Sequence, residues 1–96
     1  MYRFHDDIVY TRVSGISILV TLRNSWDRFP AVKELSPIQG CFCQGIDERM
    51  SEDELIEAIR LPEKSNKEIL RRRYRAFVRE MAEEGYLVPE GTTHES

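Results

Sequence analysis

Three Ser-x-x-Glu/Gln motifs divide the second half of the chain and constrain its fold more than any other feature. The three pairs are Ser36 with Gln39, Ser51 with Glu54, and Ser65 with Glu68. In such a capping box the serine hydroxyl accepts from a backbone N–H in the first helical turn, and the Glu or Gln side chain accepts from the serine N–H. Each motif therefore predicts the start of a helix.

Apolar residues follow each motif at helical spacing. The first helix is expected to bury a stripe made of Ile38, Cys41, Phe42, Gly45 and Ile46. The second presents Leu55, Ile56 and Ile59 and should stop before Pro62. The third and longest places on one face Leu70, Tyr74, Phe77, Val78 and Met81. Gly85 is positioned to cap that helix, after which residues 86–88 should return to the core.

The first half of the chain has strand patterns instead. Residues 8–13 alternate between two faces, and Ser14-Gly15 then supplies a tight turn. The next strand has an apolar side formed by Ile16, Ile18, Val20 and Leu22. Residues 31–35 predict a third strand, and because Pro30 has no N–H to donate, this strand suits a sheet edge.

This order of elements predicts an α+β fold of winged-helix type, with an N-terminal three-stranded antiparallel sheet followed by three helices. Ninety-six residues make one domain, expected over residues 1–88, with residues 89–96 as a flexible tail. The longest apolar run, residues 16–22, is too short and too polar to span a membrane. The start, MYRFHDD, does not resemble a secretion signal, so a cytoplasmic protein is expected.

The sequence offers no recognisable catalytic or metal site. Cys41 and Cys43 are too close to form a disulfide, and His5 and His94 lie at opposite ends of the chain. We expect Cys41 to be a small buried residue and Cys43 to be partly exposed. Neither histidine is placed to activate a nucleophile, and no glycine-rich phosphate loop is present. We therefore expect no catalytic residues, no metal and no cofactor.

Charge is separated along the chain. The net charge is −3, which argues against a general nucleic-acid binder. Residues 47–57 are mainly acidic, whereas residues 60–79 carry eight basic side chains against two acidic ones. The run Arg71-Arg72-Arg73-Tyr74-Arg75 has two interpretations. It is either a solvated helix face with pairs such as Glu68–Arg72, or a surface that binds an anionic partner such as an acidic peptide.

Four segments together resemble a known family. They are Gly15-Ile16-Ser17-Ile18-Leu19-Val20, Ala31-Val32-Lys33-Glu34-Leu35-Ser36, Met50-Ser51-Glu52-Asp53-Glu54-Leu55-Ile56 and Met81-Ala82-Glu83-Glu84-Gly85-Tyr86-Leu87. In this order they are similar to the PqqD-like family, the peptide-binding domains also called RiPP recognition elements. The resemblance runs from about residue 8 to residue 88. Where the family often has Leu-Asn-x-Thr, this chain has Leu35-Ser36-Pro37-Ile38, and Ser36 can still cap the helix.

The resemblance implies a non-catalytic domain that binds the leader segment of a ribosomally made precursor peptide and presents it to a modifying enzyme, often a radical SAM enzyme. It implies that the leader adds as a strand beside the third strand and lies against the third helix. The strand would supply Ala31, Val32, Lys33, Glu34 and Leu35. The helix would supply Ile69, Arg72, Arg73, Ala76 and Glu80.

Two other hypotheses remain open at this stage. A winged-helix DNA-binding regulator is favoured by the arginine run but opposed by the net acidity and by a hairpin that precedes the helices. A subunit or dimerisation module without a ligand is the second. We expect a monomer or weak homodimer with no nucleic-acid or membrane partner.

Overall fold

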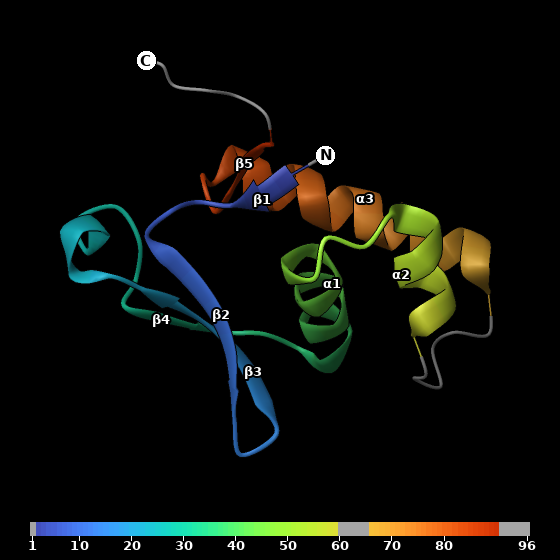
Figure 1. Cartoon of the computed structure of the whole chain (residues 1–96), viewed down its shortest axis with the longest axis horizontal. Coiled ribbons are helices and arrows are strands. Elements are labelled where there is room, and N and C mark those ends of the chain that lie inside the picture. The colour runs from blue at the N-terminus through green and yellow to red at the C-terminus, as the bar shows by residue number, and fades with distance from the viewer. Residues whose placement is uncertain (1, 60–65, 91–96) are drawn as a thin grey trace.

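The computed structural model describes residues 2–59 and 66–90 (Figure 1). Its elements are β1 (Tyr2–Phe4), β2 (Ile8–Val13), β3 (Ile16–Thr21), the 3-10 helix η1 (Arg23–Ser25), β4 (Val32–Glu34), α1 (Pro37–Asp47), α2 (Glu52–Ala58), α3 (Lys67–Glu83) and β5 (Leu87–Pro89). Strands β2, β3 and β4 form an antiparallel sheet, and three helices follow it. The predicted α+β fold class is therefore confirmed. None of the helices within these residues is long and apolar enough to cross a membrane.

The predicted hairpin is present in the predicted register. Strand β2 pairs with β3 from Ile8↔Thr21 to Val13↔Ile16. At the turn, Ser14 and Gly15 have φ values of 52° and 82°, which is the left-handed pair that a two-residue hairpin loop requires. Strand β4 pairs only with β3 and forms the edge of the sheet, as its proline-led sequence predicts.

The side of β3 that faces the helices is not its apolar side. Ile16 is 47% exposed, whereas Leu19, which shares its face of the strand with Ser17 and Thr21, is fully buried. The hydroxyl groups of this inner face have partners: Thr21 donates to the Pro30 carbonyl at 2.7 Å, and Ser17 lies 3.2 Å from the Tyr10 hydroxyl. Polar residues can therefore face inward at little cost, and the apolar side of β3 is left toward solvent.

The serine caps of the first two helices are confirmed. Ser36 and Ser51 each form a complete capping box, with Gln39 and Glu54 respectively. Ser65, the third predicted cap, lies outside the described residues. The N-cap of α3 is Asn66, whose side chain accepts from the Ile69 N–H at 3.1 Å, so the cap lies one residue later than predicted. Asparagine caps a helix as well as serine does.

The core lies between the sheet and the helices, which Figure 1 shows gathered on one side of the hairpin. Helix α1 is the central element because it contacts β3 on one side and, through the Phe42 ring against Tyr74 and Phe77, packs on α3. Its buried face is consequently wider than one stripe. Cys43 is fully buried and Cys41 only partly so, the reverse of the sequence prediction.

A second, two-stranded sheet joins the two ends of the domain, and the sequence analysis missed it. Strand β1 pairs antiparallel with β5, from Tyr2↔Pro89 to Phe4↔Leu87. The predicted cap at Gly85 makes this return possible: φ is 90°, and the Tyr86 N–H donates to the Met81 carbonyl at 2.9 Å. That bond closes a Schellman motif and turns the chain back beside β1.

Candidate functional site

Strand β4 offers an open backbone edge. Hydrogen bonds of 2.9 Å join it to β3 through the Ala31 carbonyl and the Leu35 N–H. Because backbone groups alternate in direction along an antiparallel strand, residues 31, 33 and 35 face β3. Val32 and Glu34 therefore turn their N–H and C=O groups toward the edge. No hydrogen bond to these four groups is found within residues 2–59 and 66–90.

The loop that precedes β4 does not close this edge. The Trp26 indole N–H donates to the Thr21 carbonyl at 2.8 Å, on β3. Phe29 is buried and packs on Tyr86, with ring centroids 4.7 Å apart. These contacts hold the Trp26 side chain to β3 and the Phe29 side chain to the turn after α3.

The side chains of β4 connect the strand to the end of α3. Lys33 is on the same face of the sheet as the buried Leu19, and its ammonium group lies 5.9 Å from the centroid of the Tyr86 ring. Leu35 is 5% exposed, whereas Val32, on the opposite face, is 55% exposed. A peptide strand added at this edge would continue the sheet beyond β4. Its inward face would then lie on the same side of the sheet as the C-terminal end of α3.

The five helix residues expected at the site share one exposed strip of α3. They are Ile69, Arg72, Arg73, Ala76 and Glu80, and all five are exposed. The buried residues of the same helix are Leu70, Phe77 and Met81. At 100° per residue, the five exposed residues form a strip beside the buried face, which we call the open flank of α3. The sequence-predicted helix residues are thus brought together, while their contact with a peptide stays a prediction.

The arginines of α3 fall into two groups. Arg71 and Arg75 both bind the Glu52 carboxylate of α2 at 2.8 Å, and Arg71 also pairs with Asp53 at 2.6 Å. These hydrogen bonds, led by the one from Arg75, lower the pKa of the Glu52 carboxyl below its ordinary value. Arg72 and Arg73 form no ion pair with any described residue, so the Glu68–Arg72 pair that one of the two interpretations offered is not formed. The open flank therefore carries two arginines without a carboxylate partner among the described residues, together with the exposed carboxylate of Glu80.

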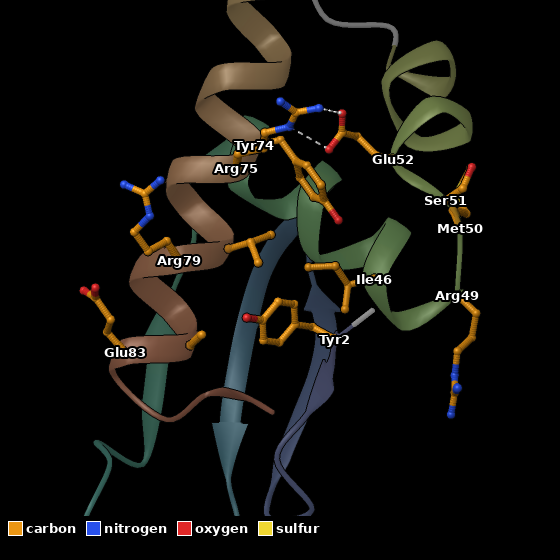
Figure 2. Close-up of a pocket in the computed structure, with 12 residues that line it drawn as sticks. Tyr2, Ile46, Arg49, Met50, Ser51, Glu52, Tyr74, Arg75, Arg79 and Glu83 are labelled. Atoms are coloured by element: carbon orange, nitrogen blue, oxygen red, sulfur yellow. Dashed lines mark hydrogen bonds and ion pairs between the residues drawn. The ribbon is translucent and has the colours of Figure 1, made fainter. Parts of the chain in front are cut away.

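A cavity of about 770 Å³ lies on the other flank of α3 (Figure 2). Tyr2 and Tyr74 point into it, Ile46 and Val78 contribute apolar wall, and the Arg75–Glu52 hydrogen bonds close one end. The sequence analysis did not find this cavity. Its walls come from β1, α1, α2 and α3, and no local pattern reveals which residues four separate elements bring together.

The chemistry of the described residues does not point to a nucleophile or a metal centre. Burial, with a contribution from Asp47, raises the pKa of the Cys43 thiol to about 12, so this group stays protonated at neutral pH. In residues 2–59 and 66–90, no three His, Cys, Asp or Glu side chains are grouped closely enough to hold a metal ion.

Comparison with known proteins supports the fold. No family model matches the sequence, and no curated protein matches it significantly. A solved structure, TbiB1 in complex with the TbiA(beta) leader peptide, is similar with a TM-score of 0.69 at 20% sequence identity. The match covers 96% of this chain and 99% of TbiB1. The chain therefore has, over nearly its whole length, the fold of a protein solved with a leader peptide, and the resemblance to PqqD-like domains is supported at the level of the fold.

Proposed function

We propose that this protein is a non-catalytic domain that binds the leader segment of a ribosomally made precursor peptide. The observation that carries the proposal is the likeness in fold to TbiB1, whose structure contains a leader peptide. The open edge of β4 supports it independently, because unpaired strand edges are where extended peptides add to a sheet.

The leader pairs with β4 through the backbone groups of Val32 and Glu34. Each residue offers one donor and one acceptor, so a peptide strand can form up to about four hydrogen bonds there. Each contributes about 0.5–1.5 kcal/mol net. Backbone pairing of this kind supplies affinity with little dependence on sequence, so selectivity has to come from the side chains on either side.

The surrounding side chains favour a leader that is partly apolar and partly acidic. Ile69 is 49% exposed on the open flank and offers an apolar contact. Arg72 and Arg73 have no carboxylate partner within the described part of the chain, and Lys33 adds a third positive charge on the inward side of β4. A carboxylate on the leader would form charge-assisted hydrogen bonds with these groups, which are stronger than neutral ones.

Leader binding would help a modifying enzyme by raising the local concentration of its substrate. A precursor held through its leader keeps the attached core segment near any enzyme associated with the domain, which raises the effective concentration of substrate. We propose a radical SAM enzyme as the partner and the cytoplasm as the location.

An amide NMR titration with the leader half of a short precursor encoded beside its gene tests the proposal. Shifts should concentrate in residues 31–35 and along residues 69–80. Val32→Pro removes one outward N–H but none of the bonds from β4 to β3, so the sheet should persist while leader affinity falls about tenfold. Val32→Thr keeps the N–H and serves as the control. Full affinity in a folded Val32→Pro variant would overturn strand addition at this edge.

Duplex DNA is the second candidate ligand, favoured by the positive charges of Arg72 and Arg73. If α3 binds DNA, affinity for arbitrary duplexes should fall steeply as salt rises from 50 to 200 mM, on the order of tenfold per few phosphate contacts. Fluorescence anisotropy with a labelled duplex measures this. The net charge of −3 leads us to expect no binding at 200 mM salt.

A further inference from the structure

The exposed apolar side chains of this protein are concentrated on one face. Among the described residues, eight large hydrophobic side chains are exposed. Four belong to the side of the sheet that faces away from the helices: Val9, Val13, Ile16 and Val32. Single exposed hydrophobic residues are ordinary, but a contiguous group marks a surface that another molecule covers.

The register of the sheet arranges this surface, which we call the outer face, in rows. One row runs across all three strands through Val9, Val20 and Val32. A neighbouring row contains Thr11, Ile18 and Glu34, and the last contains Val13 and Ile16. Glu34 is thus the one charged residue in these rows. A flat surface of β-branched side chains with almost no charge is suited to packing against another sheet.

We propose that the outer face is a self-association surface, on which two copies of this chain pack sheet against sheet. A two-fold axis sets the same surface of one copy against that of the other, so an apolar row meets an apolar row. Glu34 is at the edge strand rather than in the middle, so the centre of the contact contains no like charges. A charged partner would find few groups here with which to pair.

The size of the face determines how stable such a dimer can be. Two strands of six residues and one of three, with strands about 4.8 Å apart and about 3.4 Å per residue, cover roughly 250 Å². Stable complexes bury about 800 Å² on each partner. The dimer should therefore be weak, with a Kd of about 0.1–1 mM. The open edge of β4 lies beside the outer face rather than on it, so the dimer leaves the proposed leader site accessible.

Dilution of the labelled protein from about 1 mM to 20 µM, followed by NMR shifts and translational diffusion, tests this proposal. Diffusion should slow at high concentration, and shifts should concentrate at Val9, Val20 and Ile18. Higher salt should strengthen the association, because each copy carries a net charge of −3 that salt screens. Constant diffusion and constant shifts up to 1 mM would overturn the proposal.

A matched pair of variants separates the outer face from other apolar contacts. Val9→Lys and Ile69→Lys each place a charge at a position that is nearly half exposed, 45% and 49% respectively. Val9→Lys should abolish the concentration dependence and Ile69→Lys should not; Val13→Lys repeats the test at a second position should Val9→Lys unfold. Equal loss in Val9→Lys and Ile69→Lys would contradict the assignment to the outer face.

Leader titration distinguishes this inference from the proposed function. Leader affinity of the Val9→Lys variant should equal that of the parent protein, whatever its oligomeric state. A different result is that the concentration-dependent shifts fall on the edge groups of β4 and that added leader dissociates the dimer. The copies would then pair edge to edge, so the proposal of face packing would be wrong while leader binding would stand.

Discussion

Four arginines occupy five successive positions near the middle of α3, and their surroundings give them different roles. Arg71 and Arg75 are directed to α2, where Glu52 and Asp53 accept their hydrogen bonds. Arg72 and Arg73 emerge on the open flank, without a carboxylate partner among the described residues. Position on the helix, and not the residue type, therefore decides which guanidinium group is available to a ligand.

A double variant tests this division. Arg72→Glu with Arg73→Glu should weaken binding of an acidic leader by more than about tenfold, because two attractive contacts become repulsive. The melting temperature should hardly change, because neither side chain is paired in the structure. Isothermal titration calorimetry and a thermal melt measure the two effects. Retained affinity in the folded double variant would remove both arginines from the site.

Arg75→Glu is the matched control on the same helix. Its carboxylate would face Glu52, so the α2–α3 contact loses an ion pair and gains a repulsion. We expect a lower melting temperature, and leader affinity within about twofold of the parent when measured below that temperature.

The environment of Cys43 predicts its reactivity. The thiol is fully buried, and burial raises its pKa to about 12, so it should resist alkylation at pH 8. Iodoacetamide followed by intact-mass measurement should show no label at Cys43 in the native protein and labels at both cysteines after denaturation in urea. Rapid native labelling of Cys43 in a Cys41→Ser background would show that α1 opens locally.

At the scale of elements, α2 is held to α3 by a small charge network. Glu52 lies in the first turn of α2, where a negative charge also interacts favourably with the helix dipole. Lys67 at the start of α3 pairs with Glu57 near the end of α2. This network runs along both helices, and it neutralises much of the charge separation that the sequence alone displays.

Glu52 makes the stability of this contact depend on pH. Its folded-state pKa is lowered from 4.5, chiefly by the hydrogen bond from Arg75, so its contribution is present above pH 4.5 and is lost as the pH falls below that value. Glu52→Gln should cost about 1 kcal/mol at pH 7 and less at pH 2.5. Chemical denaturation at both pH values measures the difference, and an equal cost at both would contradict the electrostatic explanation.

The two sheets differ in how readily they can be predicted from the sequence. The β2–β3 hairpin is local: alternation sets the strands, and Ser14-Gly15 sets the turn. The β1–β5 pair joins residues more than eighty positions apart, and each strand has only three residues. Strands so short contain too little alternation to be recognised, and their pairing depends on α3 returning the chain to the correct place.

At the scale of the whole molecule, the β1–β5 sheet closes the domain. Besides its backbone pairing, the His5 N–H donates to the Tyr86 carbonyl at 2.8 Å. Phe4 packs on the core, and Arg49 at the end of α1 pairs with Glu90 just after β5. Tyr2 also forms part of the wall of the cavity beside α3. The first strand thus supports both the core and the back of the helix that carries the proposed site.

Removal of residues 1–4 should therefore destabilise the entire domain. Loss of the buried part of Phe4 and of the β1–β5 pairing should lower the melting temperature by about 10 °C. Differential scanning calorimetry measures this change. Arg3→Ser is the control: it keeps the strand but loses an ion pair with the exposed Asp6 and a side-chain hydrogen bond to the Phe4 carbonyl, and it should shift the melting temperature by about 2 °C or less. A truncated protein that melts like the parent would contradict this role for β1.

The sequence by itself determined the elements whose signals are local. The caps at Ser36 and Ser51, the turn at Ser14-Gly15 and the αL cap at Gly85 depend on hydrogen bonds and backbone conformations within a few residues. Each could be predicted without knowledge of the rest of the chain. The predicted class, a sheet followed by three helices, followed from their order.

Only the tertiary structure decided which faces of the elements are buried and which charged side chains are paired. Strand β3 has apolar residues on both sides, so burial of Leu19 in place of Ile16 depended on where α1 packed on the sheet, at a contact where the Tyr10 hydroxyl of β2 donates to the Gly40 carbonyl of α1. Cys43 replaced Cys41 in the core because α1 is covered from more than one direction. The position of Glu52 on α2 determines that Arg71 and Arg75 of α3 form ion pairs. All three outcomes depend on contacts between elements distant in sequence, which periodicity within one element cannot specify.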